Sequence, residues 1–169
     1  MMHIRNATTD DAPLLAALIA AANQDVARRF GLDAANCPKH PSFCTTEWIL
    51  ADLDRAVTYF IAEDDGAAVG CVALEHADGN MAYLNRLAVL PGQRRKGTGW
   101  RLVRHVLDHA ARLRVRSISI GIIAAHTELR EWYGRRGFIE GETKSFPHLP
   151  FQVTYLMRAV DTGSDRADT

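Results

Sequence analysis

A basic, glycine-containing loop, PGQRRKGTGW at residues 91–100, is the segment of this sequence with the clearest chemistry. The apolar run LAVL at residues 87–90 precedes it, so we expect a strand to enter the loop and the loop to become the N-terminus of a helix. The first amide N–H groups of a helix have no partner within it, and glycines let an anion approach the backbone closely. The segment therefore predicts a cradle for a phosphate or pyrophosphate group.

This loop is neither a Walker A loop nor a dinucleotide-binding loop. Thr98, and not lysine, follows Gly97, and the glycine spacing is not the G-x-G-x-x-G of dinucleotide-binding folds. The charge distribution agrees with an anionic partner. Residues 94–116 carry a formal charge of +7 and the rest of the chain carries −7, although the net charge of the whole is zero.

Two patterns resemble metal sites, and we expect neither to bind a metal. Cys37, His40 and Cys44 supply three zinc-capable side chains, but a structural zinc site needs four ligands. An ordinary loop or the wall of a binding pocket explains them instead. His105 and His109 share a helix face, yet the residues between them lack the glutamate of the zinc-protease motif.

The loop resembles the R/Q-x-x-G-x-G/A signature of the GNAT superfamily of acyl-CoA-dependent N-acetyltransferases, through Arg94, Gly97 and Gly99. Residues 132–138, WYGRRGF, are similar to the family's Y-x-x-x-G-F segment, and residues 121–129 and 146–151 look like a bacterial subgroup. The likeness covers residues 3–160. It implies an α/β (α+β) fold class: the GNAT fold, with a mixed central sheet of about seven strands, an antiparallel meander and flanking helices.

The resemblance also implies acetyl-CoA as co-substrate, without a metal. Strand backbone would pair with the pantetheine arm, the loop would hold the pyrophosphate, and basic side chains would reach the ribose phosphate. His126 stands where many members carry a cofactor-contacting asparagine, and a helix-capping or solvated histidine is the alternative. The expected cofactor-binding residues are Leu87, Ala88, Val89, Arg94, Arg95, Lys96, Gly97, Thr98, Gly99 and His126.

Acyl transfer from a thioester to an amine needs a neutral amine, a donor for the oxyanion and a proton for the departing thiolate. By the resemblance, Tyr133 corresponds to the tyrosine beside the thioester sulfur and is the expected acid, with a core tyrosine as the alternative. The N–H of Val89 is the expected oxyanion donor, because the family opens a bulge at this strand. The family often has glutamate where this sequence has Tyr83, so the usual base is missing.

Several other groups could serve as the base: Glu75, His76, Asn85, Glu47 and His148. Glu75 is our expected choice, acting directly or through water, with a surface carboxylate as the alternative. Cys71 belongs to a strand and is expected in the core, so we predict no covalent enzyme intermediate.

Hydropathy patterns give the elements that must position these groups. Helical spacing predicts helices at residues 13–29, 45–55, 97–113 and 127–136. β-type runs predict strands at residues 4–7, 57–63, 67–75, 81–90, 117–123, 138–143 and 151–159, with a hairpin turn at residues 64–66. Alternation along 81–90 would place Tyr83, Asn85, Leu87 and Val89 on one face.

Length and composition bound the class of protein. With 169 residues, 47% hydrophobic and 24% charged, we expect one folded domain over residues 1–160 and a disordered tail at 161–169. A collagen-like chain and a disulfide-stapled miniprotein are excluded. No apolar run approaches the roughly 18 residues that span a bilayer, and the N-terminus lacks a signal-peptide core, so we expect a cytoplasmic protein.

The sequence therefore predicts an acyltransferase that moves acetyl from acetyl-CoA to a primary amine by direct attack in a ternary complex. A nucleic-acid-binding module is disfavoured because few aromatic residues interleave with the basic run, and an acyl-CoA sensor of the same fold stays open. The expected acceptor walls, residues 23–46 and 144–151, have no concentrated acidic patch, which disfavours a polyamine. A small amine, an antibiotic, an amino acid and a peptide N-terminus all stay open, as does the oligomeric state, for which a homodimer is common.

Overall fold

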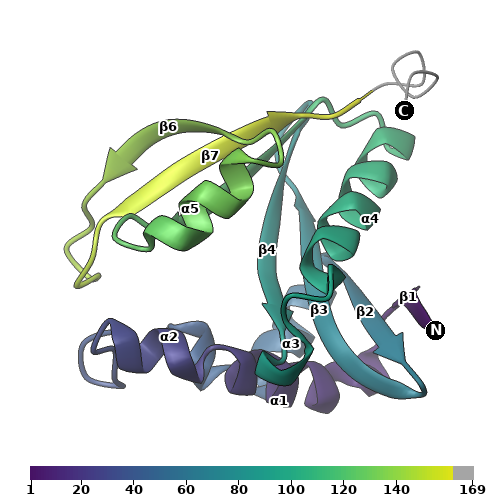
Figure 1. The fold of residues 1–169 in the computed structure, drawn as a ribbon, viewed down its shortest axis with the longest axis horizontal. Coiled ribbons are helices and arrows are strands. Elements are labelled where there is room, and N and C mark those ends of the chain that lie inside the picture. The colour runs from purple at the N-terminus through teal and green to yellow at the C-terminus, as the bar shows by residue number, and fades with distance from the viewer. Residues whose placement is uncertain (162–169) are drawn as a thin grey trace. The chain divides into compact units, whose positions relative to one another are not determined.

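The structure of the protein is a computed structural model that describes residues 1–161. Its helices are α1 (Ala12–Ala22), α2 (Gln24–Arg29), α3 (Thr46–Asp54), α4 (Thr98–Arg112) and α5 (Thr127–Gly134) (Figure 1). Its strands are β1 (Met2–Asn6), β2 (Thr58–Asp64), β3 (Ala67–His76), β4 (Met81–Val89), β5 (Ser117–Ile123), β6 (Ile139–Lys144) and β7 (Val153–Ala159). Short 3-10 helices lie at η1 (Thr9–Asp11), η2 (Pro41–Phe43) and η3 (Pro91–Gln93). Residues 162–169, which hold most of the tail predicted to be disordered, lie outside the described residues.

The strands form a mixed seven-stranded sheet in the order β1-β2-β3-β4-β5-β7-β6. β1 pairs antiparallel with β2, and β2 with β3, whereas β4 runs parallel to β5. β7 lies antiparallel between β5 and β6. The mixed sheet of seven strands that the sequence predicted is confirmed. In the described part of the chain, no helix is both long and apolar enough to cross a membrane.

The chain divides into two compact units, which we describe in turn. The first comprises Met1–Glu75 and Leu84–Val106, and the second comprises His76–Tyr83 and the chain from Leu107 onward. β4 and α4 each contribute residues to both units. The single domain over residues 1–160 stays a prediction.

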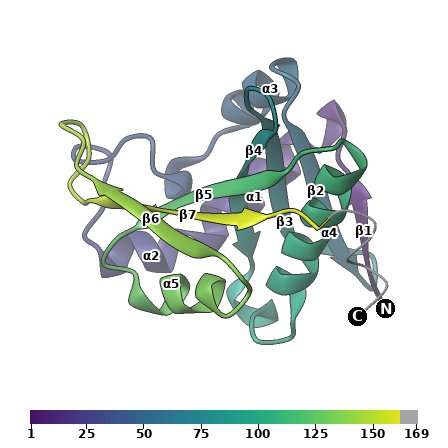
Figure 2. The same ribbon diagram turned by 90° about the horizontal axis from the view of Figure 1, so that it is seen from above.

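In the first unit, alternate residues of β2 point to opposite sides of the sheet. Tyr59 and Ile61 join a buried cluster with residues of α1 and α3, including Leu15, Ile19 and Ile49. Phe60 points the other way, and its ring contacts that of His105 on α4 with centroids 4.6 Å apart. The strands are therefore covered by α1 and α3 on one face and by the first part of α4 on the other (Figures 1 and 2).

Gly70 of β3 allows the helix α4 and the end of strand β4 to lie close to the backbone of β3. A Cβ atom at this position would lie 2.9 Å from the carbonyl oxygen of Ala88 and 3.1 Å from Cδ1 of Leu102. A larger residue would push the backbone of β4 away, because a backbone atom cannot rotate aside. This close approach fixes the start of α4, and hence the loop in front of it, against the sheet.

In the second unit, β5, β7 and β6 pair side by side, and α5 lies along β6 and β7 (Figures 1 and 2). The buried residues Ile118, Ile120 and Leu156 form part of its core. The rings of Tyr133 and Phe138 meet edge to face at 5.2 Å between centroids, which ties the end of α5 to the residues that lead into β6.

The predicted continuous helix over residues 13–29 was wrong, because the chain breaks at Asn23. Asn23 has φ −105° and ψ 4°, outside the helical region, and separates α1 from α2. Its side-chain Nδ2 donates a hydrogen bond to the carbonyl oxygen of Ile19 at 2.8 Å. A short amide side chain competes in this way with the backbone for helix carbonyls.

The predicted alternation along β4 was also wrong. Asn85 Nδ2 donates a hydrogen bond to Glu75, and Arg86 Nε donates one to Asp52. Arg55 donates to both of these carboxylates. The neighbouring residues Asn85 and Arg86 therefore contact the same hydrogen-bond network. Strict alternation would point them to opposite faces. Arg86 has φ 54°, in the left-handed region, and this irregularity inserts a bulge that turns both side chains to the same side.

Candidate active site

The loop between β4 and α4 is built as an anion cradle. Arg95 has φ 65° and Gly97 has φ 81°, so left-handed residues alternate with ordinary ones, which turns successive N–H groups toward one side. The amide N–H groups of residues 95–99 donate to no acceptor among residues 1–161. Five consecutive donors at a helix N-terminus are the expected arrangement for holding a phosphate.

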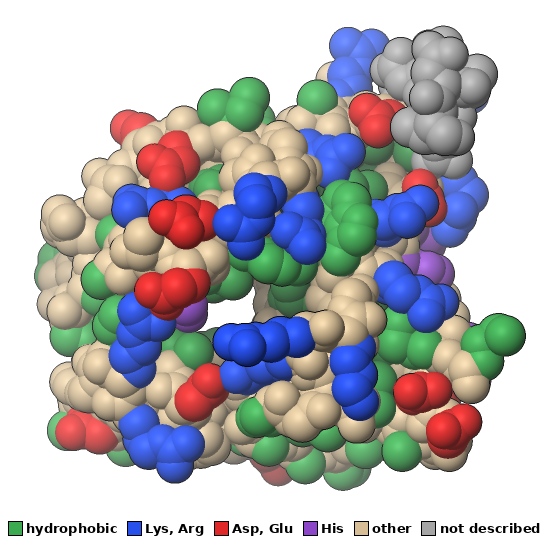
Figure 3. Space-filling view, in the orientation of Figure 1, with side chains coloured by type: hydrophobic (Ala, Val, Ile, Leu, Met, Phe, Trp, Pro, Cys, Tyr) green, Lys and Arg blue, Asp and Glu red, His purple; other side chains and the backbone are tan. Residues whose placement is uncertain are grey.

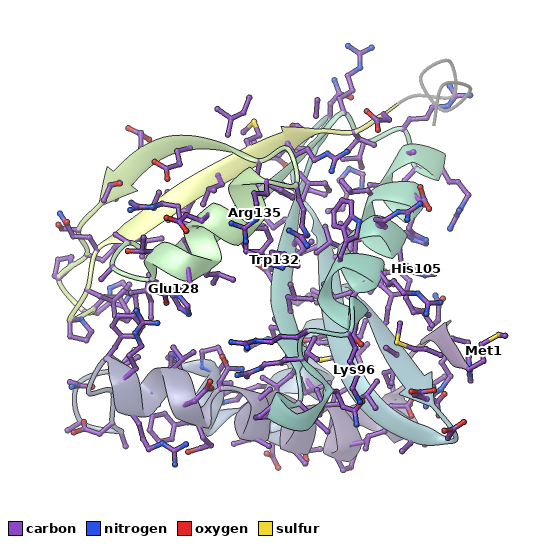
Figure 4. The ribbon with its side chains drawn as sticks, viewed as in Figure 1. Met1, Lys96, His105, Glu128, Trp132 and Arg135 are labelled. Carbon is purple, nitrogen blue, oxygen red and sulfur yellow. The ribbon has the colours of Figure 1, made fainter. Side chains whose placement is uncertain are left out.

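The residues present fit the pyrophosphate that the sequence predicted for this loop. A Cβ atom at Gly97 would meet nothing within 4 Å, so the space in front of the loop backbone is open. Thr98 is buried and its Cγ2 faces Gly70, so this residue anchors the loop and offers its backbone amide. Lys and Arg side chains gather over the loop, where Lys96 lies (Figures 3 and 4).

Arg94 is engaged by neighbours of its own unit. Its guanidinium group pairs with Asp25 at 2.6 Å and donates to the carbonyl oxygen of Ala22 at 2.7 Å. Its Nε donates to the carbonyl oxygen of Val89 at 3.1 Å. The hydrogen bond from Arg94 lowers the pKa of Asp25. In this structure Arg94 therefore ties the loop to α1 and α2, and its predicted contact with the pyrophosphate stays a prediction.

The last residues of β4 are placed to pair with an extended ligand. β4 pairs with β5 only over Met81–Tyr83, and no pairing of its residues 84–89 with β5 occurs in the described chain. Ala88 is buried in the core cluster, which holds Leu87 and Val89 on either side of it. The carbonyl oxygen of Val89 already accepts from Arg94, so an oxyanion would depend on the N–H group of Val89.

A pocket of about 330 Å³ lies in the first unit beside the bulge of β4, and the candidate base Glu75 lines it together with Asp52, Arg55, Asn85 and Arg86. The Glu75 carboxylate accepts from Arg55 through Oε1 and from Asn85 at 3.1 Å through Oε2. The sequence singled out Glu75 and Asn85, and the structure brings both to one pocket. Glu47, His76 and His148 do not line it.

Asp52 is the buried charge at the centre of this network. Its carboxylate accepts from Tyr59 Oη at 2.6 Å, from Arg55 at 2.8 Å and from Arg86 at 3.2 Å. Burial opposes its ionisation, but the hydrogen bonds from Tyr59 and the two guanidinium groups outweigh burial and lower the pKa of Asp52. The sequence interpretation missed this residue. The available signal was its spacing, since Asp52 follows the buried Ile49 by three residues on the same face of α3.

In the second unit, Tyr133 lies near the end of α5 and is only 4% exposed. Its ring packs edge to face against Trp132 and Phe138, and Trp132 is marked in Figure 4. Burial raises the pKa of Tyr133 above its usual value. The phenol is thus held in its protonated form at neutral pH, as a general acid must be.

His126 is the N-cap residue of α5. Its Nδ1 accepts a hydrogen bond from the amide N–H of Leu129 at 3.3 Å, and Glu128 lies 3.7 Å from the same nitrogen. The capping alternative left open by the sequence is therefore the geometry that this structure shows. A contact between His126 and the cofactor stays a prediction.

The residues Cys37, His40 and Cys44 have structural surroundings. His40 is buried and its Nδ1 accepts from the amide N–H of Ser42 at 3.2 Å, which caps η2. Burial lowers the pKa of His40 and raises the pKa of both thiols. Among residues 1–161, no group of three or more His, Cys, Asp and Glu side chains is arranged to hold a metal ion.

Comparisons with known proteins identify the family of the chain. The model of the acetyltransferase (GNAT) family matches residues 15–138. The amino-acid acetyltransferase of Neisseria meningitidis serogroup A is 36% identical over 101 residues, which cover 58% of this chain and 21% of that protein. The chain therefore spans about a fifth of the length of this relative.

Solved structures show the same fold. A GNAT-family acetyltransferase from Staphylococcus aureus Mu50 has a TM-score of 0.73 and 21% identity, and the match covers 95% of this chain and 100% of that one. The PaiA N-acetyltransferase of Thermoplasma acidophilum, crystallised in complex with coenzyme A, has a TM-score of 0.77 and 14% identity, covering 92% of this chain and 98% of that one.

Proposed function

Since the chain belongs to the GNAT family of acetyltransferases, and is therefore an acyltransferase, we propose that it moves acetyl from acetyl-CoA directly to a primary amine in a ternary complex. The observation that carries this proposal is the row of five amide N–H groups, residues 95–99, that donate to no acceptor in the described chain. An anion with several oxygens, such as the pyrophosphate of coenzyme A, satisfies such donors.

The chain's own residues divide the chemistry between them. The amine gives up a proton toward Glu75, directly or through water, and its nitrogen then bonds to the acetyl carbonyl carbon. The N–H group of Val89 donates to the carbonyl oxygen as negative charge develops on it. The carbon–sulfur bond breaks, the sulfur takes the proton of Tyr133, and the proton lost by the acylated nitrogen restores the phenol through solvent.

Direct attack is favoured over a covalent enzyme intermediate. All three cysteines, Cys37, Cys44 and Cys71, are buried and unpaired. Burial raises the pKa of the Cys71 thiol, and its Sγ lies 3.7 Å from the carbonyl oxygen of Arg86. A buried thiol of raised pKa is a poor nucleophile, because the thiolate is the reactive form. The acetyl group therefore passes straight to the amine.

The acid role of Tyr133 sets a condition on timing. A phenol has an ordinary pKa near 10 and a thiol one of about 8.5, and burial raises the pKa of Tyr133 further. A stepwise transfer to a free thiolate would run uphill. The proton must therefore move in concert with carbon–sulfur bond breaking, so that the departing sulfur leaves as a thiol and no free thiolate forms.

Cofactor binding is tested first, by thermal unfolding with acetyl-CoA, coenzyme A or ATP. A ligand that binds only the folded protein raises its stability by RT ln(1 + [L]/Kd), or about 2.7 kcal/mol at 100 times Kd. We expect both coenzyme A species to raise Tm and ATP to have little effect. If millimolar coenzyme A leaves Tm unchanged, the cradle does not hold this cofactor.

Tyr133→Phe then separates an enzyme from an acyl-CoA sensor of the same fold. The variant keeps the ring that packs against Trp132 and Phe138 and removes only the hydroxyl group. We expect kcat for thiol release to fall about 100-fold while the Kd for coenzyme A is unchanged. Tyr155→Phe, on β7, is the matched control. Equal kcat in the two variants would remove Tyr133 from the mechanism.

A further inference from the structure

The pocket beside the bulge of β4 holds charges of both signs in equal number. Asp52 and Glu75 contribute two carboxylates, and Arg55 and Arg86 contribute two guanidinium groups. Arg55 pairs with both carboxylates and Arg86 pairs with Asp52, so the pocket carries no net charge. A ligand with one ammonium group and one carboxylate keeps that balance, whereas a simple alkyl amine or an anion adds a net charge.

Arg86 is the residue of this pocket with unused binding capacity. Its side chain is only 22% exposed, and its Nε donates to Asp52 at 3.2 Å. Neither of its terminal nitrogens donates a hydrogen bond to any group among residues 1–161. Both terminal nitrogens are accessible at the pocket surface, so this guanidinium fork is available to a planar anionic ligand such as a carboxylate.

The backbone at Arg86 is strained as well. A φ of 54° is unfavourable for a residue with a side chain, and such strain gathers at functional sites. The strain turns the Arg86 side chain to the side of Asp52 and Glu75, where the guanidinium carbon also lies 5.7 Å from the Trp48 ring centroid. Strand alternation alone would have pointed this side chain to the opposite face.

Arg86 lies next to the segment of β4 that is proposed to bind acetyl-CoA. Arg86 directly precedes residues 87–89, the end of β4 at which acetyl-CoA is proposed to bind. The backbone of Arg86 is thus one strand residue, or roughly 3.3 Å along β4, from the segment that would present the thioester. Glu75, the proposed base, lines the same pocket.

We propose that this pocket binds the acceptor as a free α-amino acid, whose carboxylate is held by the guanidinium fork of Arg86 and whose ammonium group faces Glu75. This inference rests on the proposed function and names its substrate class. The pocket volume of about 330 Å³ corresponds to about ten water-sized groups, which suits a small amino acid. Pro41, Val57 and Ala73 supply an apolar wall for its side chain.

The substrate-side test leaves the protein unchanged. Thiol release from acetyl-CoA is measured with the twenty L-amino acids, with the amide of each, and with butylamine as a carboxylate-free amine. We expect the best amino acid to exceed its own amide at least tenfold in kcat/KM, since a charge-assisted bidentate pair is lost on amidation. A free amine of similar size should be used no better than the amide.

Arg86→Gln tests the assignment of the carboxylate to this residue. We expect KM for the best amino acid to rise at least tenfold, while kcat/KM for its amide changes less than threefold and KM for acetyl-CoA is unchanged. Arg104→Gln, a change of the same type on the exposed face of α4, is the matched control and should alter none of these. Arg86→Lys keeps the charge and loses the fork, so we expect an intermediate KM.

The outcomes separate this inference from the function on which it rests. If butylamine or the amides are acetylated as well as the amino acids, the enzyme stands and the amino-acid pocket is overturned. If coenzyme A raises Tm but no amine in the panel releases thiol, the amino-acid pocket is overturned, while the cofactor site stands. If Arg86→Gln fails to fold, the amide comparison on the unaltered protein still decides the matter.

Discussion

At the residue scale, Arg5 and Asp11 form the ion pair with the clearest effect on a pKa. Asp11 accepts two hydrogen bonds from Arg5, at 2.8 and 2.9 Å, and one from the amide N–H of Thr8 at 2.8 Å. The hydrogen bonds from Arg5 are the main cause that lowers the pKa of Asp11 to about 2. Because its folded-state pKa lies below the unfolded value, Asp11 stabilises the folded chain only where it is ionised.

We predict that Asp11→Asn lowers the free energy of unfolding by about 1–2 kcal/mol at pH 7, a figure that allows for solvent screening of the partly exposed Arg5. Asparagine still accepts from Thr8, so the change isolates the charge. The difference from the unaltered chain should be complete above about pH 4 and disappear as the pH falls toward 2. Urea unfolding at several pH values measures it.

Asp10→Asn is the control for this experiment, since Asp10 is exposed on the same short helix. Its effect should stay within about 0.5 kcal/mol at every pH, as for most surface substitutions. A difference for Asp11→Asn that persists unchanged at pH 2 would mean that packing of the side chain, and not its charge, stabilises the chain.

At the element scale, the loop in front of α4 and the β2–β3 hairpin offer a matched pair of glycines. Gly97 and Gly66 both have φ 81°, and a Cβ atom at either would meet nothing within 4 Å. Alanine should therefore cost the same backbone strain at both positions, about 1–2 kcal/mol. Only Gly97 lies in the anion-binding loop. A loss of coenzyme A affinity that occurs in Gly97→Ala and not in Gly66→Ala therefore reports on ligand binding.

We predict that Gly97→Ala weakens coenzyme A binding at least tenfold, because its Cβ would occupy the space that a phosphate needs next to the backbone N–H groups. Gly66→Ala should bind coenzyme A as the unaltered chain does, with a similar fall in Tm in both variants. Isothermal titration calorimetry gives the two Kd values. Equal Kd values in the two variants would place the pyrophosphate away from residues 95–99.

Local sequence patterns predict the turns and the basic loop, but not the long-range contacts of the site. The turn at Gly66, the basic loop and the helix after it follow from glycine and charge spacing, and the structure has each in place. Two contacts of the site join residues far apart, 69 residues for Arg94 with Asp25 and 34 for Arg86 with Asp52. No local pattern encodes such pairs.

The position of the bulge in β4 illustrates a second limit, because the family resemblance implied a bulge in this strand but did not place it at Arg86. Arg86 adopts φ 54°, a conformation in which glycine or asparagine is the usual signal, so its residue type gave no warning. Strict alternation then assigned the wrong face to the residues that follow. Arg86, which lines the pocket, is thus a second residue that the sequence interpretation missed, beside Asp52.

At the scale of the whole molecule, the chain is neutral but unevenly charged. Residues 94–116 carry +7 against −7 elsewhere, and the basic loop is part of this segment. Such a segment attracts the phosphates of acetyl-CoA over distances comparable with the Debye length, which is about 10 Å at 0.1 M salt and 3 Å at 1 M. The attraction should raise the association rate and fade as salt is added.

We therefore predict that kcat/KM for acetyl-CoA falls about tenfold between roughly 0.05 and 0.5 M NaCl. S-acetylpantetheine carries the same thioester without phosphates, so its kcat/KM should change less than twofold over that range. Steady-state thiol release measures both, with Tm followed at each salt concentration to exclude unfolding. Because the two substrates share one reacting group, a parallel decline for both would mean that salt acts on the catalytic groups or the acceptor, and that the basic segment does not attract the cofactor.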